Sequence, residues 1–132
     1  MLKITRKVEY ALIALRHLQQ MERGQLSSAK SMALEYGIPQ ELLAKILQKL
    51  SKEEIISSVK GPTGGYKICK DPSTVNMTKF FEILEGPVGI MDCYFDSNCE
   101  QLNGCNIREP INRINDNIRT MFNKMTLADI TY

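Results

Sequence analysis

Apolar residues recur at three- and four-residue steps over residues 6–21, and this spacing predicts an amphipathic helix. The stretch contains neither glycine nor proline, and Arg23-Gly24 marks its end. The apolar positions are Val8, Ala11, Leu12, Leu15 and Leu18. The first predicted element is therefore a helix with one face suited to a core.

A second and a third helix are predicted after residue 27, with a short turn between them. Ser27 and Ser28 are N-cap candidates for the second helix, and Gly37 suits a left-handed helix end. Pro39 suits the first turn of the third helix. The apolar face of this third helix consists of Leu42, Leu43, Ile46, Leu47 and Leu50. A short helix, a glycine-containing turn and a longer helix are typical of a helix-turn-helix.

Two short segments rich in β-forming residues follow the third helix, at residues 55–60 and 66–70. The five residues between them read Gly-Pro-Thr-Gly-Gly, which is a strong turn signal. The two segments predict a hairpin, and a hairpin directly after the third helix is a wing. The predicted fold class is therefore mainly α (α+β), a winged helix-turn-helix with a long C-terminal dimerisation helix.

The rest of the chain predicts two helices around an irregular segment. Asn76 can cap a helix that Gly86-Pro87 ends, whereas residues 92–106 show neither a helical nor a strand period. A last helix is predicted from about residue 110 to about residue 125. Its apolar stripe consists of Ile111, Ile114, Ile118, Met121, Phe122 and Met125. Such a helix either folds back on its own domain or packs against a second copy, and we favour the homodimer.

These elements divide the chain into two parts. Residues 1–75 are predicted to form a winged helix-turn-helix DNA-binding domain. Residues 76–132 are predicted to contain a helix, a cysteine loop at 92–106 and the dimerisation helix.

The charge distribution favours contact between the N-terminal half and a polyanion. The formal net charge is only +2, but residues 1–70 carry 12 Lys/Arg against 6 Asp/Glu, and residues 71–132 carry 5 against 9.

We see no leader and no apolar run of bilayer length, so we expect a cytoplasmic protein without membrane contact. We see no nucleophile–base pair and no standard phosphate loop, so we expect neither an enzyme nor a small-molecule substrate.

The predicted partner of the basic half is double-stranded DNA, which the third helix would read in the major groove. Glutamine can pair with adenine, lysine with guanine, and glutamate can accept from cytosine. The start of the second helix suits phosphate contacts, and the wing can reach a minor groove. The candidate DNA-contacting residues are Ser28, Lys30, Gln40, Glu41, Lys45, Gln48, Lys49, Lys60 and Thr63. The alternative is that the helix-hairpin core contacts protein, and the basic bias of this half makes that alternative weaker.

Three of the four cysteines, Cys93, Cys99 and Cys105, follow one another at six-residue steps. On a helix this step would spread them around the cylinder, so a common role requires a loop that wraps a ligand. Thiolates are the usual ligands of iron–sulfur clusters and also suit zinc, but both normally need four protein ligands. Spacing alone leaves a metal site, free cysteines and a disulfide all open. Cys69 is expected in the wing strand as a half-buried structural residue.

The chain resembles the IscR/NsrR group of bacterial winged-helix regulators along nearly its whole length. The segments that carry the resemblance are Glu9-Tyr10-Ala11-Leu12, Tyr36-Gly37-Ile38-Pro39, residues 57–66, Leu84-Glu85-Gly86-Pro87, the C-x5-C-x5-C loop and residues 126–130. The resemblance implies a homodimer on a partly palindromic promoter site. It also implies an iron–sulfur cluster held by Cys93, Cys99, Cys105 and one ligand that is not cysteine.

The fourth ligand differs among members of this group. Some members use a histidine three residues after the last cysteine, but that position is Arg108 here. Others use a carboxylate near the start of the first helix, donated by the partner subunit, and that position here is Glu9. We therefore expect Glu9 as the ligand, and His17, the only histidine, as a core-edge or surface residue. Two departures from the group are Glu54, where a helix-ending glycine is common, and Lys60, where arginine is usual.

The resemblance further implies that the cluster controls promoter binding in response to nitric oxide, oxygen or redox state, or iron. The 4Fe–4S form is favoured and the 2Fe–2S form is its alternative. The rival interpretation on the same fold is a cluster-free regulator that senses redox state through thiols or zinc.

Overall fold

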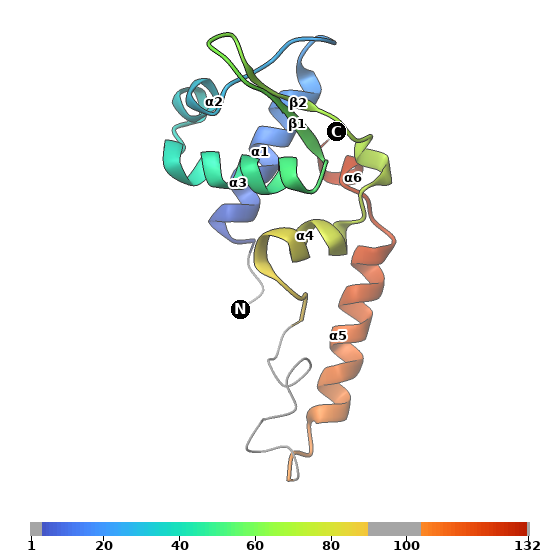
Figure 1. The fold of residues 1–132 in the computed structure, drawn as a ribbon. Helices are drawn as coiled ribbons and strands as arrows, with labels where there is room; N and C mark the ends of the chain where they lie inside the picture. The colour runs from blue at the N-terminus through green and yellow to red at the C-terminus, as the bar shows by residue number, and fades with distance from the viewer. Residues whose placement is uncertain (1–3, 90–103, 132) are drawn as a thin grey trace.

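The computed structural model describes residues 4–89 and 104–131 of the chain (Figure 1). The elements are α1 (Arg6–Gln20), α2 (Ala29–Tyr36), α3 (Gln40–Lys52), β1 (Ile56–Val59), β2 (Gly65–Ile68), the 3-10 turn η1 (Pro72–Thr74), α4 (Met77–Glu85), α5 (Arg108–Asn123) and α6 (Ala128–Thr131). The chain is mostly helical with one two-stranded sheet, which confirms the predicted winged helix-turn-helix fold class.

The helix-turn-helix begins and ends largely where local chemistry predicts. The Ser28 hydroxyl accepts a hydrogen bond from the Ser31 backbone N–H at 3.0 Å, so Ser28 is the N-cap of α2. Gly37 ends this helix in the left-handed region, with φ of 65°. Pro39 was expected in the first turn of α3, but it is the N-cap and the helix starts at Gln40. The proline ring fixes φ near a helical value, whereas ψ of 123° keeps Pro39 outside the helix.

The wing is an antiparallel hairpin in which Ile56 pairs with Ile68 and Val59 with Gly65. Its second strand ends at Ile68, one residue before Cys69. Cys69 was expected in the strand and half-buried, but it lies outside β2 and is exposed. The ladder ends here because the backbone N–H groups of Cys69 and Lys70 both donate to the Ile55 carbonyl. The thiol therefore reaches the surface.

The apolar core contains residues from both predicted parts of the chain. Leu15 of α1, Leu47 of α3, Phe80 of α4 and Leu127, which precedes α6, are all fully buried in one cluster. After α5 the chain comes back to this cluster. Backbone hydrogen bonds fix it there, such as the bond of 2.8 Å from the Leu127 N–H to the Val75 carbonyl. The core thus crosses the predicted division between residues 75 and 76.

Helix α5 extends away from this core (Figure 1). Its C-terminal half packs on α4, where the rings of Phe122 and Phe81 meet edge to face at 5.0 Å. Of its sixteen residues only Asn115 is fully buried. None of the helices in residues 4–89 and 104–131 is long and apolar enough to cross a membrane.

Candidate nucleic-acid interface and cysteine region

Helix α3 is anchored by its apolar face and displays its polar face. Its buried residues Leu43, Ile46, Leu47 and Leu50 lie on one side of the helix. The predicted DNA-reading residues Gln40, Glu41, Lys45, Gln48 and Lys49 are all exposed. The core therefore fixes the helix while leaving these side chains free to meet a partner.

The exposed residues of α3 border two hollows. Gln40 and Glu41 line the first, of about 570 Å³, together with Pro39 and Ala44. Ala44 was not predicted as a site residue, although its small apolar side chain suits contact with a thymine methyl group. This first hollow therefore lies beside the N-terminal turn of the helix.

The second hollow, of about 420 Å³, lies beside the rest of α3. Its rim carries Lys45, Gln48 and Lys49 and also two lysines that the sequence did not single out, Lys7 and Lys52. The helical spacing could have indicated Lys52 as a site residue, because it lies one turn beyond Gln48 and Lys49. Lys7 comes from α1 and gave no local signal. The basic residues of the two helices therefore form one positive rim.

The start of α2 and the wing tip complete the predicted interface. Lys30 is exposed in the first turn of α2, next to the Ser28 cap. Lys60 and Thr63 are exposed at the hairpin tip. Figure 1 places α2, α3 and the tip of the β1–β2 hairpin on the same side of the molecule. All three parts can thus face one partner.

Glycine at position 65 allows the wing to lie against the chain that enters α2. A Cβ atom at Gly65 would lie 2.8 Å from the carbonyl carbon and oxygen of Ser27, which is too close for any side chain. The backbones of Ser27 and Tyr66 exchange two hydrogen bonds, of 3.1 Å and 2.8 Å. The Gly-Gly sequence therefore explains both the turn and the docking of the wing.

The cysteine region is described only in part. Cys93 and Cys99 lie outside the described residues, whereas Cys105 is a half-buried free thiol three residues before α5. Glu9 lies in the first turn of α1 and forms an exposed ion pair with Arg6 at 2.9 Å. Figure 1 shows the N-terminal end of α1 and the N-terminal end of α5 at separate places in the molecule. Among residues 4–89 and 104–131, no three His, Cys, Asp or Glu side chains are grouped to hold a metal.

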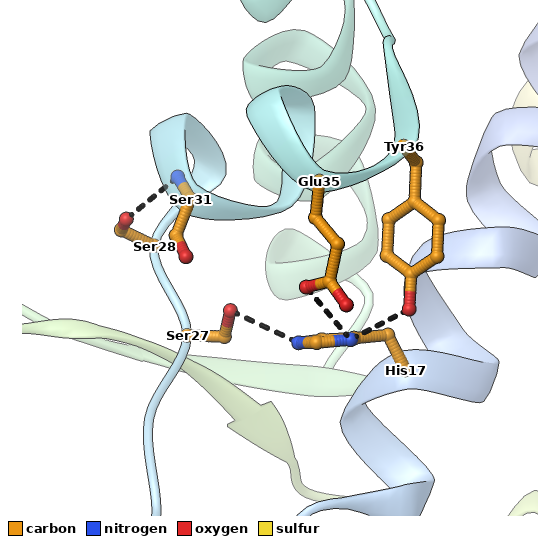
Figure 2. Close-up of polar contacts among 6 residues, drawn as sticks. All are labelled: His17, Ser27, Ser28, Ser31, Glu35 and Tyr36. Carbon is orange, nitrogen blue, oxygen red and sulfur yellow. Dashed lines mark hydrogen bonds and ion pairs between the residues drawn. The ribbon is translucent and has the colours of Figure 1, made fainter.

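Two residues near these regions, Arg119 and His17, make polar contacts that the sequence did not predict. The Arg119 guanidinium of α5 donates to the Val88 carbonyl at 3.0 Å and to the Glu82 carboxylate at 3.2 Å, which ties the segment after α4 to α5. His17 lies at the core edge, as expected, but its ring contacts the hydroxyls of Ser27 and Tyr36 (Figure 2). The pairs are far apart in sequence, so no local pattern indicates them.

Comparison with known proteins identifies relatives of the whole chain. Residues 4–132 match the Rrf2 family, described as "Iron-dependent Transcriptional regulator". A protein named as an HTH-type transcriptional regulator of Aquifex aeolicus is 29% identical over 126 residues, which cover 93% of this chain and 87% of the relative. An rrf2-like HTH-type regulator of Rhodobacter capsulatus is 28% identical over 136 residues, covering 96% and 91%.

Solved structures agree with this assignment. CymR, the global cysteine regulator of B. subtilis, superposes with a TM-score of 0.73 at 24% identity, over 99% of this chain and 97% of CymR. A transcriptional regulator from Listeria innocua gives 0.72 at 26% identity, over 96% and 84%. T. potens IscR gives 0.69 at 24% identity, over 97% and 85%. The predicted resemblance and the fold are thereby confirmed.

Proposed function

Because the chain belongs to the Rrf2 family of transcriptional regulators, we propose that it is a homodimer whose binding to promoter DNA is controlled by an iron–sulfur cluster. The observation that carries the DNA-binding part is the arrangement of α3, the α2 N-terminus and the wing tip. These three parts display polar and basic residues on one side of a fold that the family model matches over residues 4–132.

In the proposed complex the N-terminal turn of α3 enters the major groove. Gln40 and Glu41 contact base edges there, since their amide and carboxylate groups suit adenine and cytosine. The basic rim of Lys45 and Lys49, with Gln48, follows the phosphate backbone. At the flanks, Ser28 and Lys30 contact phosphate through the α2 N-terminus, and Lys60 and Thr63 reach the minor groove from the wing.

The proposed dimer forms along α5. Ile107, Ile114 and Met121 recur at seven-residue steps and are each about half exposed, at 50%, 46% and 51%. A seven-residue apolar repeat suits packing against a second helix of the same kind. A second copy of α5 would cover this stripe and would place two α3 helices for two half-sites.

The proposed cluster ligands are Cys93, Cys99 and Cys105 of one subunit and Glu9 of the partner subunit. The described part of this set fits, because Cys105 is a free thiol and Glu9 is 44% exposed in a helical turn that reaches solvent. The N-terminal ends of α1 and α5 lie apart within one chain, which favours donation of Glu9 across the dimer. The 4Fe–4S form remains our preference over 2Fe–2S. Cys93, Cys99, Cys105 and Glu9 would hold the cluster, which would supply iron able to react with nitric oxide or oxygen. A carboxylate such as Glu9 is a more exchangeable iron ligand than a thiolate.

A second candidate function is a cluster-free thiol- or zinc-based sensor. The similarity to CymR favours it, since that protein is named a cysteine regulator and its Staphylococcus aureus counterpart has been solved in an oxidised form. Cys105 is only half-buried, so a reagent or oxidant can reach its thiol. The two candidates differ in whether iron and sulfide accompany the protein.

Anaerobic purification followed by iron and sulfide analysis separates the two candidates. We expect a coloured protein with iron and acid-labile sulfide in equal amounts, and we expect Cys105→Ser and Glu9→Gln to lower both. Cys69→Ser is the matched control, because Cys69 is also a free thiol but lies at the wing. A colourless wild-type protein whose DNA affinity still responds to thiol oxidation would establish the second candidate instead.

Salt dependence tests the DNA contacts, with a duplex that the wild-type protein selects from a random-sequence pool. We expect Lys45→Ala and Lys49→Ala each to reduce the slope of log affinity against log salt by about 1. The control is Lys79→Ala, which removes an exposed lysine of α4. Ser28→Asp should keep the α2 cap but weaken binding by repelling phosphate. Equal slopes for all variants would exclude the proposed face.

A further inference from the structure

His17 lies on α1 and contacts two other segments of the chain, one with each ring nitrogen (Figure 2). Nδ1 lies 2.8 Å from the Tyr36 hydroxyl oxygen, and Nε2 lies 3.2 Å from the Ser27 hydroxyl oxygen. The rings of His17 and Tyr36 also meet edge to face, with centroids 5.4 Å apart. The His17 side chain is only 18% exposed, so water competes little for these contacts.

The two segments that His17 contacts are those to which the flanking DNA contacts are assigned in the proposed function. Tyr36 is the last residue of α2. Ser27 directly precedes the Ser28 cap, and its backbone is bonded in both directions to Tyr66 of β2. A shift of Ser27 would therefore move the N-terminus of α2 and the wing together.

Each ring nitrogen of His17 has a hydroxyl group as its hydrogen-bond partner. The Tyr36 hydroxyl can donate to Nδ1, which leaves the Nε2–H to donate to Ser27. Partial burial, followed by the charge of Glu35, raises the pKa of the Tyr36 phenol, so it keeps its proton. The Glu35 carboxylate lies 3.8 Å from Nδ1 and adds a charged neighbour on the same side.

We propose that His17 is a positioning residue for DNA binding, which fixes the α2 N-terminus and the wing relative to each other from α1. This inference rests on the DNA-binding part of the proposed function and is independent of the cluster. An apolar side chain could fill the same volume, but it could not bond to two hydroxyls on opposite sides. The polar bridge, rather than packing alone, sets the geometry.

A double-mutant cycle on the apo protein tests the role, with the selected duplex as probe. Lys60→Ala should weaken wild-type binding about 3- to 10-fold, whereas in the His17→Leu background it should have less than about a 2-fold effect. Two further variants each retain one of the two hydrogen bonds. In His17→Gln the amide nitrogen replaces Nε2 and can still bond to the Ser27 hydroxyl, so the coupling to Lys60 should remain. In His17→Asn the amide nitrogen replaces Nδ1 and can bond only to the Tyr36 hydroxyl, so the coupling should disappear.

Amide hydrogen exchange provides a readout that a loss of stability does not imitate. In His17→Leu we expect faster exchange of the Ser27 and Tyr66 amides, while the buried Leu47 amide of α3 stays unchanged. Uniformly faster exchange, or a Lys60 effect that is equal in all four backgrounds, would overturn the inference. If Lys60→Ala leaves wild-type affinity unchanged, the proposed wing contact fails, and the exchange result alone decides the role of His17.

Discussion

Helices α3 and α5 are both amphipathic, but they find cover for their apolar faces in different ways. The thirteen-residue α3 buries Leu43, Ile46, Leu47 and Leu50 within its own chain. The sixteen-residue α5 fully buries only Asn115. The same periodicity thus has two outcomes, because a pattern shows that a face is apolar and not which molecule covers it. The apolar face of α3 is covered within its own protomer, whereas we propose that the partner subunit covers the exposed apolar stripe of α5.

Truncation in the α3 face should have the largest effect on the protomer. Leu47 is fully buried, so Leu47→Ala removes packed methyl groups and leaves a cavity. We expect a loss of about 2–5 kcal/mol in the free energy of unfolding, measured by chemical denaturation. The control is Leu34→Ala on α2, because Leu34 is 76% exposed and should change stability by no more than about 0.5 kcal/mol. Equal losses in the two variants would contradict the description of α3 as core-anchored.

A charge in the α5 stripe should act on association instead. In Ile114→Glu a carboxylate enters the proposed apolar seam, and we expect the dimer dissociation constant to rise at least about tenfold. Analytical ultracentrifugation over a concentration series measures the change. Thr120→Glu is the matched control, since Thr120 is exposed on the polar side of α5. If both variants sediment as wild type does, α5 is not the dimer interface.

The contrast between the helices also explains which features the sequence could predict. The Ser28 cap and the left-handed Gly37 depend on neighbouring residues, and both were predicted. The exposure of Gln40 and Lys45 follows from the phase of the α3 apolar stripe, so this part of the site was also predictable. These features need only local information about a few consecutive residues.

Features that depend on distant partners were missed or wrong. Cys69 was placed in the strand, although the Ile55 carbonyl decides where that strand ends. His17 was predicted as a core-edge or surface residue, but the sequence did not indicate its contacts with residues ten and nineteen positions away. The bond from Arg119 to Val88 spans thirty-one positions. No periodicity connects such pairs, because the tertiary fold alone brings them together.

The smallest predicted effect concerns the end of α3 and sharpens the contrast with α5. Glu54 has a positive φ of 62°, and the N–H groups of Glu54 and Ile55 bond back to the Ser51 and Leu50 carbonyls. This is the left-handed helix end that glycine favours, so Glu54→Gly should relieve strain and raise the free energy of unfolding by up to about 1 kcal/mol. Denaturation at low and at high protein concentration should give the same gain, because the α3 end belongs to the protomer. A gain for Glu54→Gly that depends on protein concentration would instead connect the end of α3 to the dimer.

Gly37→Ala is the converse test at the end of α2. The φ of Gly37 is 65°, and no atom lies within 4 Å of the added methyl group. The expected loss of about 1 kcal/mol in the free energy of unfolding therefore comes from the backbone alone.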